Sequence, residues 1–253
     1  MGLIRAYNPS PAIQNNIVYV NFHIDEKANR QTGIFSAMHI GGHSPFRIDE
    51  NMIITVTSYK GGVGKTTTAI HLAAYLQRLA PTLLVDGDAI RSATKWSRRS
   101  GDTGLPFRVV THAQMVSHIR DYQHIIIDTE GNPTDDDFKD LASNCDLLVI
   151  PAVPESVATD GLTHTLAKLR SLGNKTHRVL LTMVPPKPRT EGQQLRDMLT
   201  SESIPVFEAE IPRLAAFEKA AAEGLPVYGV KDDRNAARAW LAYEAAGKEI
   251  TRG

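Results

Sequence analysis

One short loop constrains this chain more than any other part of its sequence. Residues 60–67 (KGGVGKTT) follow an apolar run, IITVT, and precede a run with helical periodicity, TTTAIHLAAYLQRLA. Glycines let backbone N–H groups turn inward, and the N-terminus of the following helix adds partial positive charge. A strand, a glycine-rich loop and a helix in this order predict a cradle for phosphate groups rather than a glycine turn that merely ends a strand.

The rest of the chain after Met52 alternates short apolar runs with helical stretches. A sheet of mostly parallel strands with crossover helices requires such an alternation. The expected strands cover residues 53–57, 82–85, 107–110, 124–128, 147–150, 178–184 and 205–207. The expected helices cover residues 65–79, 113–121, 134–143, 157–172, 191–201, 215–223 and 234–246. The pattern predicts a three-layer α/β fold with a mainly parallel sheet of about seven strands flanked by helices.

Residues 1–51 differ from the rest because they are polar, rich in Asn, His and Gly, and lack a sustained period. Only residues 17–22 (IVYVNF) have the pattern of a short strand. We therefore divide the chain into an N-terminal extension, residues 1–51, and a main domain, residues 52–253. Two interpretations of the extension stay open: an upstream segment from a misassigned start codon, and an ordinary ordered N-terminal element.

The composition excludes several classes of protein. The chain has 28 Lys and Arg against 28 Asp and Glu, which argues against a globally basic nucleic-acid binder and leaves room for a local patch. Its single cysteine, Cys145, excludes an internal disulfide and a CxxC site within one chain. No apolar run approaches the ~18 residues of a spanning helix, and no secretory leader is recognisable, so we expect a cytoplasmic protein.

Parts of one nucleotide site follow one another along the chain. Lys65 is expected to reach the β- and γ-phosphates, and the Thr66 hydroxyl is expected to bind Mg²⁺. Asp128 ends a buried-strand pattern, III, and a carboxylate in that position supports Mg²⁺ beside the phosphates. Asp88 follows another apolar run, at the edge where open parallel sheets bind ligands. The residues expected to surround the nucleotide are Gly61, Gly62, Val63, Gly64, Lys65, Thr66 and Thr67.

The loop departs from the ordinary G-x-x-x-x-G-K-[ST] pattern, since Tyr59 stands where the first glycine belongs and Lys60 follows it. The string KGGVGKTT resembles the deviant Walker A motif of the ParA/MinD group of P-loop ATPases, most closely that of ParA-type partition ATPases. This resemblance implies a P-loop NTPase fold, slow Mg²⁺-dependent ATP hydrolysis, and a homodimer that sandwiches its nucleotides only when ATP is bound. In that group the early lysine, here Lys60, reaches across the dimer interface to the partner's nucleotide. The second aspartate of the D-x-D segment, here Asp88, positions or activates the attacking water.

The resemblance covers about residues 52–230 and includes departures from the family pattern. Ala89 and Ile90 replace the usual Pro-Gln pair after the D-x-D segment. After the Walker B aspartate, Thr129-Glu130-Gly131 replaces the usual Thr followed by two prolines. The later segments that match the family imply further nucleotide contacts by Thr182, Met183 and Pro212.

The implied function depends on what the ATP-bound dimer recognises. ParA proteins in that state bind DNA nonspecifically and associate with the nucleoid, until a ParB-like or other adaptor protein stimulates hydrolysis and release. Basic side chains that displace counterions supply such affinity. The candidate DNA contacts are Lys187, Arg189, Arg213 and Lys219, which are interleaved with Asp and Glu residues. The expected function is therefore the segregation of plasmid or chromosome DNA.

Other functions within the group stay open. A ParA-like protein can instead position a protein cargo, such as a carboxysome or a chemoreceptor array, and the sequence does not separate the two cargoes. A metabolic ATP-dependent ligase of the dethiobiotin synthetase kind shares the fold, but Lys60 weighs against it. A membrane ATPase of the MinD type would end in a basic amphipathic helix. Residues 234–250 are instead rich in Ala and contain Glu244 and Glu249, so we expect no membrane partner.

Overall fold

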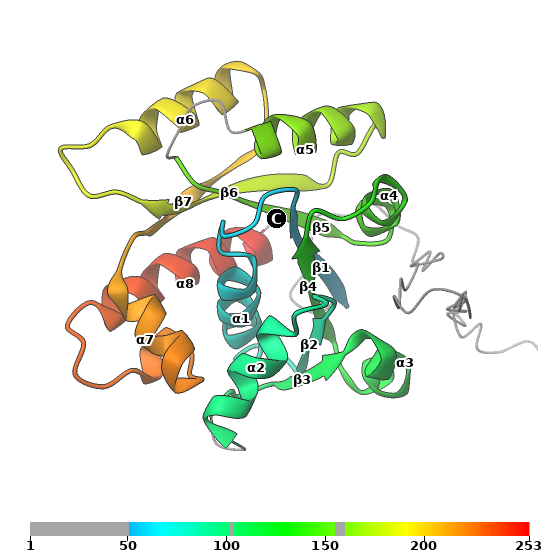
Figure 1. Cartoon of the computed structure of the whole chain (residues 1–253), viewed down its shortest axis with the longest axis vertical. Coiled ribbons are helices and arrows are strands. Elements are labelled where there is room, and N and C mark those ends of the chain that lie inside the picture. Colours follow the sequence, from blue (N-terminus) through cyan, green and yellow to red (C-terminus); the bar gives the residue numbers. More distant parts are fainter. Residues whose placement is uncertain (1–50, 102–103, 155–159, 253) are drawn as a thin grey trace, which may run out of the picture.

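A parallel sheet of seven strands runs through the protein (Figure 1). The structure is a computed structural model that describes residues 51–101, 104–154 and 160–252. The expected strand at residues 17–22, like the rest of residues 1–50, lies outside this described part. The strands are β1 (Met52–Ser58), β2 (Thr82–Asp86), β3 (Arg108–Thr111), β4 (His124–Gly131), β5 (Leu147–Ala152), β6 (His177–Val184) and β7 (Val206–Pro212). Their order is β3-β2-β4-β1-β5-β6-β7, and every neighbouring pair is parallel.

Helices cover both faces of this sheet (Figure 1). They are α1 (Lys65–Leu76), α2 (Ser92–Arg99), α3 (Met115–His118), α4 (Asp135–Ser143), α5 (Asp160–Ser171), α6 (Glu191–Ser201), α7 (Ala215–Glu223) and α8 (Ala236–Arg252). Short 3₁₀ segments among the described residues are η2 (His112–Gln114), η3 (Ile119–Asp121) and η4 (Val227–Gly229). One apolar cluster joins α1, α2, α7 and α8 to the sheet. A second cluster joins α4, α5 and α6 to β5 and β6, and α3 belongs to a third.

The middle of the sheet forms because its strands are mainly apolar. Every residue of β1, β2 and β5 is buried, and runs of Val, Ile and Leu are typical of parallel strands covered on both faces. The three-layer parallel α/β architecture predicted from the sequence is confirmed. Because all the strands point the same way, the loops after β1, β2 and β4 leave the sheet at one edge, where open parallel sheets bind ligands.

Several elements differ from the predicted ones. The sequence analysis misses α2, since its eight residues bury only Ala93 and Trp96 and give too short a periodic signal. Residues 113–121 belong to a series of short segments, η2, α3 and η3, rather than to one helix. β7 and α8 continue to Pro212 and Arg252, beyond the predicted ends at residues 207 and 246, whereas α1 ends at Leu76 instead of residue 79.

α8 places its apolar side chains against the core of the domain. Trp240, Tyr243 and Ile250 are buried, and the helix packs on α1 and β7. This packing requires Gly247, because a Cβ atom there would lie 2.3 Å from the Tyr75 ring. Among the residues that the structure describes, no helix is long and apolar enough to cross a membrane.

β7 forms one edge of the sheet, and its pairing with β6 is irregular. Val206 pairs with Val179, but the next pair joins Glu210 to Leu181. β7 therefore has two more residues than β6 between these pairs, which is a bulge. Residues in a bulge lose regular ladder partners, so their backbone groups need other hydrogen bonds.

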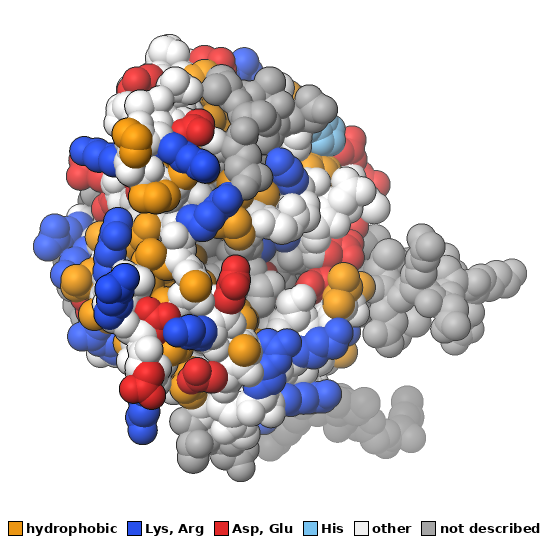
Figure 2. Space-filling view, turned by 60° about the vertical axis from the view of Figure 1, so that its left-hand side comes forward, with side chains coloured by type: hydrophobic (Ala, Val, Ile, Leu, Met, Phe, Trp, Pro, Cys, Tyr) orange, Lys and Arg blue, Asp and Glu red, His pale blue; other side chains and the backbone are white. Residues whose placement is uncertain are grey.

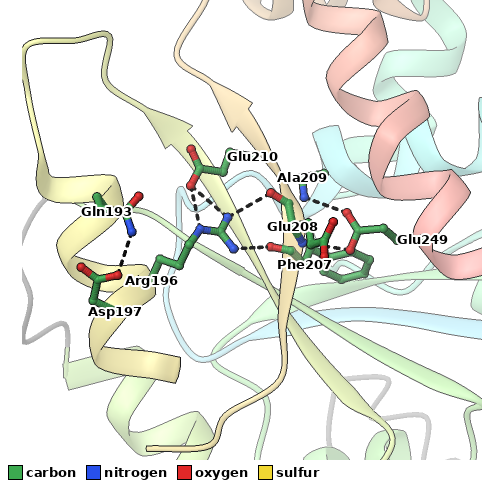
Figure 3. A network of polar contacts seen from close by, with 8 residues as sticks. All are labelled: Gln193, Arg196, Asp197, Phe207, Glu208, Ala209, Glu210 and Glu249. Carbon is green, nitrogen blue, oxygen red and sulfur yellow. Dashed lines mark hydrogen bonds and ion pairs between the residues drawn. The ribbon is translucent and has the colours of Figure 1, made fainter. Parts of the chain in front are cut away.

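Side chains from the two neighbouring helices supply those bonds (Figure 3). Arg196 of α6 donates to the carbonyl oxygens of Phe207 and Glu208, at 2.7 and 3.2 Å. Glu249 of α8 accepts from the backbone N–H groups of Glu208 and Ala209, at 2.9 and 2.7 Å. The bulge is therefore paired by charged side chains, which also link α6 and α8 across the end of the sheet.

Candidate functional site

The candidate site lies where three neighbouring strands end. In the sheet register, Asp128 of β4 pairs with Val56 of β1 and with Asp86 of β2. The loop of residues 59–64 leaves β1 at this edge and leads into α1. The fold therefore brings together the glycine-rich loop and the two carboxylate segments that the sequence analysis assigned to one nucleotide site.

The backbone of the loop has the conformation that an anion cradle needs. Gly62 and Gly64 have φ angles of 73° and 90°, which favour glycine because they lie in the left-handed region. Gly64 precedes α1, whose N-terminus carries no side-chain cap and no acidic residue in its first turn. The first N–H groups of a helix have no intrahelical acceptor, so this end of α1 suits a phosphate group.

Lys65 is buried at the start of α1 and points toward the loop. Its Nζ donates a hydrogen bond to the carbonyl oxygen of Lys60 at 2.9 Å. Burial lowers the pKa of the Lys65 amine, while the charges of Asp128 and Asp88 oppose that shift. At Gly131, a Cβ atom would lie 3.3 Å from this Nζ, so β4 ends close against the lysine.

Asp128 is the most unusual carboxylate of the site. It is fully buried, and neither of its oxygens makes a hydrogen bond of good geometry with the described residues. Burial raises its pKa to about 8, the nearby Thr66 hydroxyl opposes the shift, and the charges of Asp86 and Asp88 add to it. A buried carboxylate without a partner beside a hydroxyl fits Mg²⁺, which prefers oxygen ligands. Thr66 and Asp128 are therefore suited to hold Mg²⁺ here.

Asp88 bonds to the turn that leads into α2. Its carboxylate accepts hydrogen bonds from the Ile90 N–H at 3.0 Å and from the Ser92 hydroxyl at 2.8 Å. The side chain is half-buried, and its charge acts on Lys65 and Asp128. Asp88 is thus held at the site by the element that the sequence analysis missed.

Asp86 has a different environment although it is only two residues away. Its carboxylate is fully buried and accepts hydrogen bonds from the Thr94 N–H at 2.8 Å and the Thr94 hydroxyl at 2.5 Å. It also accepts from the Asp88 N–H at 3.2 Å. Asp86 therefore fixes the position of α2 relative to β2 and has its own partners, whereas Asp128 lacks them.

Lys60 lies beside the N-terminal part of α5. A Cβ atom at Gly161 would lie 2.9 Å from the Lys60 Cβ, so only glycine allows this approach. The preceding Tyr59 packs its ring against His164 of α5, with ring centroids 4.3 Å apart, and its hydroxyl donates to Asp135 of α4 at 3.2 Å. The start of the loop is therefore positioned by two helices of the opposite layer.

The three further nucleotide contacts expected from the sequence lie at the ends of β6 and β7. The Thr182 hydroxyl is buried and donates to the carbonyl oxygens of Val63 and Ala152, at 2.8 and 3.3 Å. Met183 is half-buried with a φ of 50°, and its terminal methyl group would be 3.8 Å from a Cβ atom on Gly64. Pro212 ends β7. Thr182 and Met183 thus adjoin the backbone of the phosphate loop itself.

The predicted DNA contacts lie at the surface, outside the nucleotide site. Lys187 and Arg189 are exposed in the loop between β6 and α6, and Arg213 is exposed after β7. Lys219 of α7 forms an ion pair with Asp233 at 2.9 Å, and this hydrogen bond holds the pKa of the Asp233 carboxyl below its usual range. Figure 2 shows one face on which Lys and Arg side chains alternate with Asp and Glu side chains.

Sequence reasoning missed the residues that support the loop from behind. Gly131 and Gly161 are ordinary glycines in the sequence, and only the packing of Lys65 and Lys60 against them reveals their role. The contact of Tyr59 with His164 joins positions far apart in the chain, so no local pattern could indicate it. The D-x-D spacing did indicate Asp86, but this pattern does not distinguish an aspartate with a structural role from one that acts in the reaction.

Comparisons with known proteins agree with this geometry. The sequence profile of the CobQ/CobB/MinD/ParA nucleotide binding domain matches residues 54–227. The "Maintenance of carboxysome distribution protein A" of Gloeobacter kilaueensis is 33% identical over 205 residues, which cover 79% of this chain and 94% of that protein. "Protein ParA" of Rhizobium radiobacter is 26% identical over 181 residues, covering 65% and 80% of the two chains. The solved structure of the MinD cell division protein of Aquifex aeolicus has a TM-score of 0.61 at 18% identity, covering 79% and 96%.

Proposed function

Because the chain belongs to the CobQ/CobB/MinD/ParA nucleotide-binding family, we propose that it is a ParA-like ATPase that forms a sandwich dimer when ATP is bound. The observation that carries this proposal is the buried Asp128 carboxylate, which has no hydrogen bond of good geometry and lies among the charges of Lys65 and Asp88. The proposed roles are phosphate binding by Lys65, metal binding by Thr66 and Asp128, and positioning of the attacking water by Asp88.

Mg²⁺, when bound, would neutralise charge on the β- and γ-phosphate oxygens. The protein's own contribution is positioning. Lys65 lies at the N-terminus of α1, and the close approach of Gly131 limits the space around its Nζ. Asp88 keeps two hydrogen bonds to the turn before α2, so its carboxylate has a fixed orientation. Lys60 is proposed to act on the nucleotide of the partner subunit. Its side chain supports this role because it is exposed at the outer rim of the loop, beside the exposed Gly61 and Gly62.

The second part of the proposal is what the dimer binds. We propose that the ATP-bound dimer binds DNA nonspecifically through Lys187, Arg189, Arg213 and Lys219, and that an adaptor protein of the ParB kind stimulates slow hydrolysis. A dimer would combine the weakly basic surfaces of its two subunits on one DNA duplex. Each phosphate contact releases counterions, so more contacts raise the affinity for DNA. The cargo would be plasmid or chromosome DNA, with the protein on the nucleoid while ATP is bound.

A protein assembly is the second candidate cargo. The observation in its favour is the 33% identity to the carboxysome distribution protein over nearly all of that protein's length. The 26% identity to a ParA protein favours the first candidate. Both cargoes use the same nucleotide site and the same DNA surface in this proposal, and they differ only in the adaptor.

A gel shift on random-sequence duplex DNA at low salt tests the proposal. The protein is examined with ATP and Mg²⁺, with ADP and Mg²⁺, and without nucleotide. We expect a shift with ATP alone, because only the dimer would place two basic surfaces on one duplex. Equal binding in all three conditions would contradict the switch, and no binding in any condition would contradict the DNA-based function.

A further inference from the structure

α2 carries a charge pattern that the proposed function does not use. Its charged residues are Lys95, Arg98 and Arg99, and no acidic residue occurs between Arg91 and Arg99. Lys95 and Arg98 are exposed, and they form no ion pair with the described residues. Residues three apart lie on one side of a helix, so Lys95 and Arg98 point in similar directions, whereas Arg99 donates a hydrogen bond to the Ala221 carbonyl oxygen of α7. α2 therefore presents Lys95 and Arg98 together on a helix that has no acidic residue of its own.

A hollow of about 390 Å³ adjoins this surface, between α2, β3 and η2. Its lining residues are Thr94, Ser97, Arg98, Val109, Thr111 and Gln114. None of these is a carboxylate. The side-chain carbonyl of Gln114 already accepts from the N–H and the hydroxyl of Thr111, at 3.1 Å each, which leaves the Gln114 amide free to donate. Hydrogen-bond donors from Ser97, Arg98 and Gln114 thus line a hollow that opens to solvent.

The chemistry of this surface suits a phosphate backbone better than an acidic protein segment. The apolar residues of α2, Ala93 and Trp96, are both buried, so the helix itself offers no apolar anchor, and the exposed Ile90 lies two residues before it. Protein interfaces concentrate their affinity on such anchors. Phosphate oxygens are instead bound by Arg and Lys together with Ser, Thr and Gln side chains, which is the set found here. Figure 2 shows several Lys and Arg side chains together toward the lower right of that face.

We propose that backbone phosphates of duplex DNA bind to the exposed side of α2 and to the hollow beside it. This inference rests on the proposed function and adds a second DNA surface to it. The same helix is bonded to the catalytic candidate at its other end, since Ser92 donates to Asp88. DNA on α2 would therefore touch the element that orients Asp88, which the loop containing Lys187 and Arg189 does not do.

The test measures the affinity and salt dependence of binding to random-sequence duplex DNA by fluorescence anisotropy, with ATP and Mg²⁺ present. The variant is Lys95→Ala with Arg98→Ala, since neither side chain bonds to the core. The matched control is Lys139→Ala with Lys175→Ala, which removes the same charge from exposed positions elsewhere. We expect the α2 variant to bind about tenfold more weakly, with a salt slope shallower by about one for each phosphate contact removed. The control should bind like wild type.

The outcomes separate this inference from the proposed function. ATP binding and DNA-free hydrolysis should be unchanged in the α2 variant, which shows that it is folded. Wild-type affinity and slope in that variant would overturn the inference and leave the proposed function intact. No DNA binding by wild type in any nucleotide state would overturn both. Unchanged DNA binding together with lost binding of polyglutamate would show that α2 recognises an acidic polypeptide, which also overturns the inference.

Discussion

Two aspartates separated by one glycine have different surroundings in this protein. Asp86 is buried with a full set of hydrogen bonds to α2. Asp88 is half-buried, its carboxylate accepts from Ile90 in the turn before α2 and from Ser92 at the start of α2, and its charge acts on Lys65. A buried and satisfied carboxylate stabilises the fold, whereas a partly exposed one beside the phosphate loop is free to act on a ligand.

The first prediction concerns Asp88→Asn. The amide oxygen keeps an acceptor for the Ile90 N–H, so the turn before α2 should keep its structure. We expect ATP binding and ATP-dependent dimers to persist while hydrolysis falls by about 10²-fold or more, the usual contribution of a positioned proton-transfer group. Turnover of radiolabelled ATP under saturating conditions measures this. Wild-type turnover would remove Asp88 from the mechanism.

At the scale of single residues, sequence alone identifies groups whose chemistry requires one residue type in one local context. Lys65, Thr66 and Asp128 were predicted in this way, and the fold brings them to one edge of the sheet. The need for glycine at position 131 could not be predicted. It arises because a Cβ atom there would lie 3.3 Å from the Nζ of Lys65. Such constraints depend on tertiary packing, so the local sequence around the residue does not indicate them.

At the scale of secondary-structure elements, His71 attaches α1 to the C-terminal part of the domain. Its ring is fully buried, contacts the Thr67 carbonyl at 2.7 Å through Nδ1, and accepts from the Val227 N–H at 3.0 Å through Nε2. The ring also stacks on Tyr243 of α8, with centroids 4.7 Å apart. The helix that follows the phosphate loop is therefore hydrogen-bonded to η4 and packed against α8.

The second prediction is a pH dependence from His71. Burial lowers its pKa from 6.5 to about 4, and the hydrogen bond to Thr67 opposes the shift. Between these values the unfolded chain binds more protons than the folded one, so stability is complete above pH 6.5 and is lost as the pH falls toward 4. The loss should reach about 3 kcal/mol near pH 4. Urea unfolding at several pH values should show a flatter profile for His71→Gln, and an equally steep one would contradict the assignment.

The third prediction concerns the bulge in β7 (Figure 3). Arg196→Ala would leave the Phe207 carbonyl without its side-chain donor and would remove the ion pair to Glu210, at 2.9 Å. Because that pair is partly exposed, we expect a loss of about 1–2 kcal/mol in unfolding free energy. Gln193→Ala is the matched control, since Gln193 lies on the same helix and bonds only to the exposed Asp197. Chemical denaturation compares the two, and equal midpoints would contradict the role of Arg196.

Element boundaries were predictable where the sequence itself carries clear breaks at both ends. α6 and α7 have the predicted boundaries, because each is a periodic stretch ending at clear breaks. α2 is short and begins after Arg91, whose φ of 58° is a left-handed conformation that Arg rarely adopts. The carboxylate of Asp86, eight residues before Thr94, stabilises this start. The helix propensities of residues 92–99 do not reflect this hydrogen bond from a distant residue, so the sequence did not predict α2.

At the scale of the whole molecule, the proposed dimer would depend on the outer rim of the phosphate loop. The fourth prediction is that Lys60→Ala binds ATP but remains a monomer in sedimentation, since only its side chain would reach the partner's phosphates. Gly229→Ala, where a Cβ atom would make ordinary contacts with Leu225, is a control that should dimerise normally. ATP-dependent dimers of Lys60→Ala would refute the action of this lysine across the interface.

The hydrogen-bonded bulge of β7 also affects how readily copies of the protein associate through their sheet edges. A regular strand at the edge of a sheet presents free N–H and C=O groups that invite pairing with the same strand of another molecule, the first step of aggregation. Here Arg196 and Glu249 already occupy backbone groups of residues 207–209. If the dimer gathers on DNA as proposed, this arrangement would keep crowded copies from pairing their sheets edge to edge through β7.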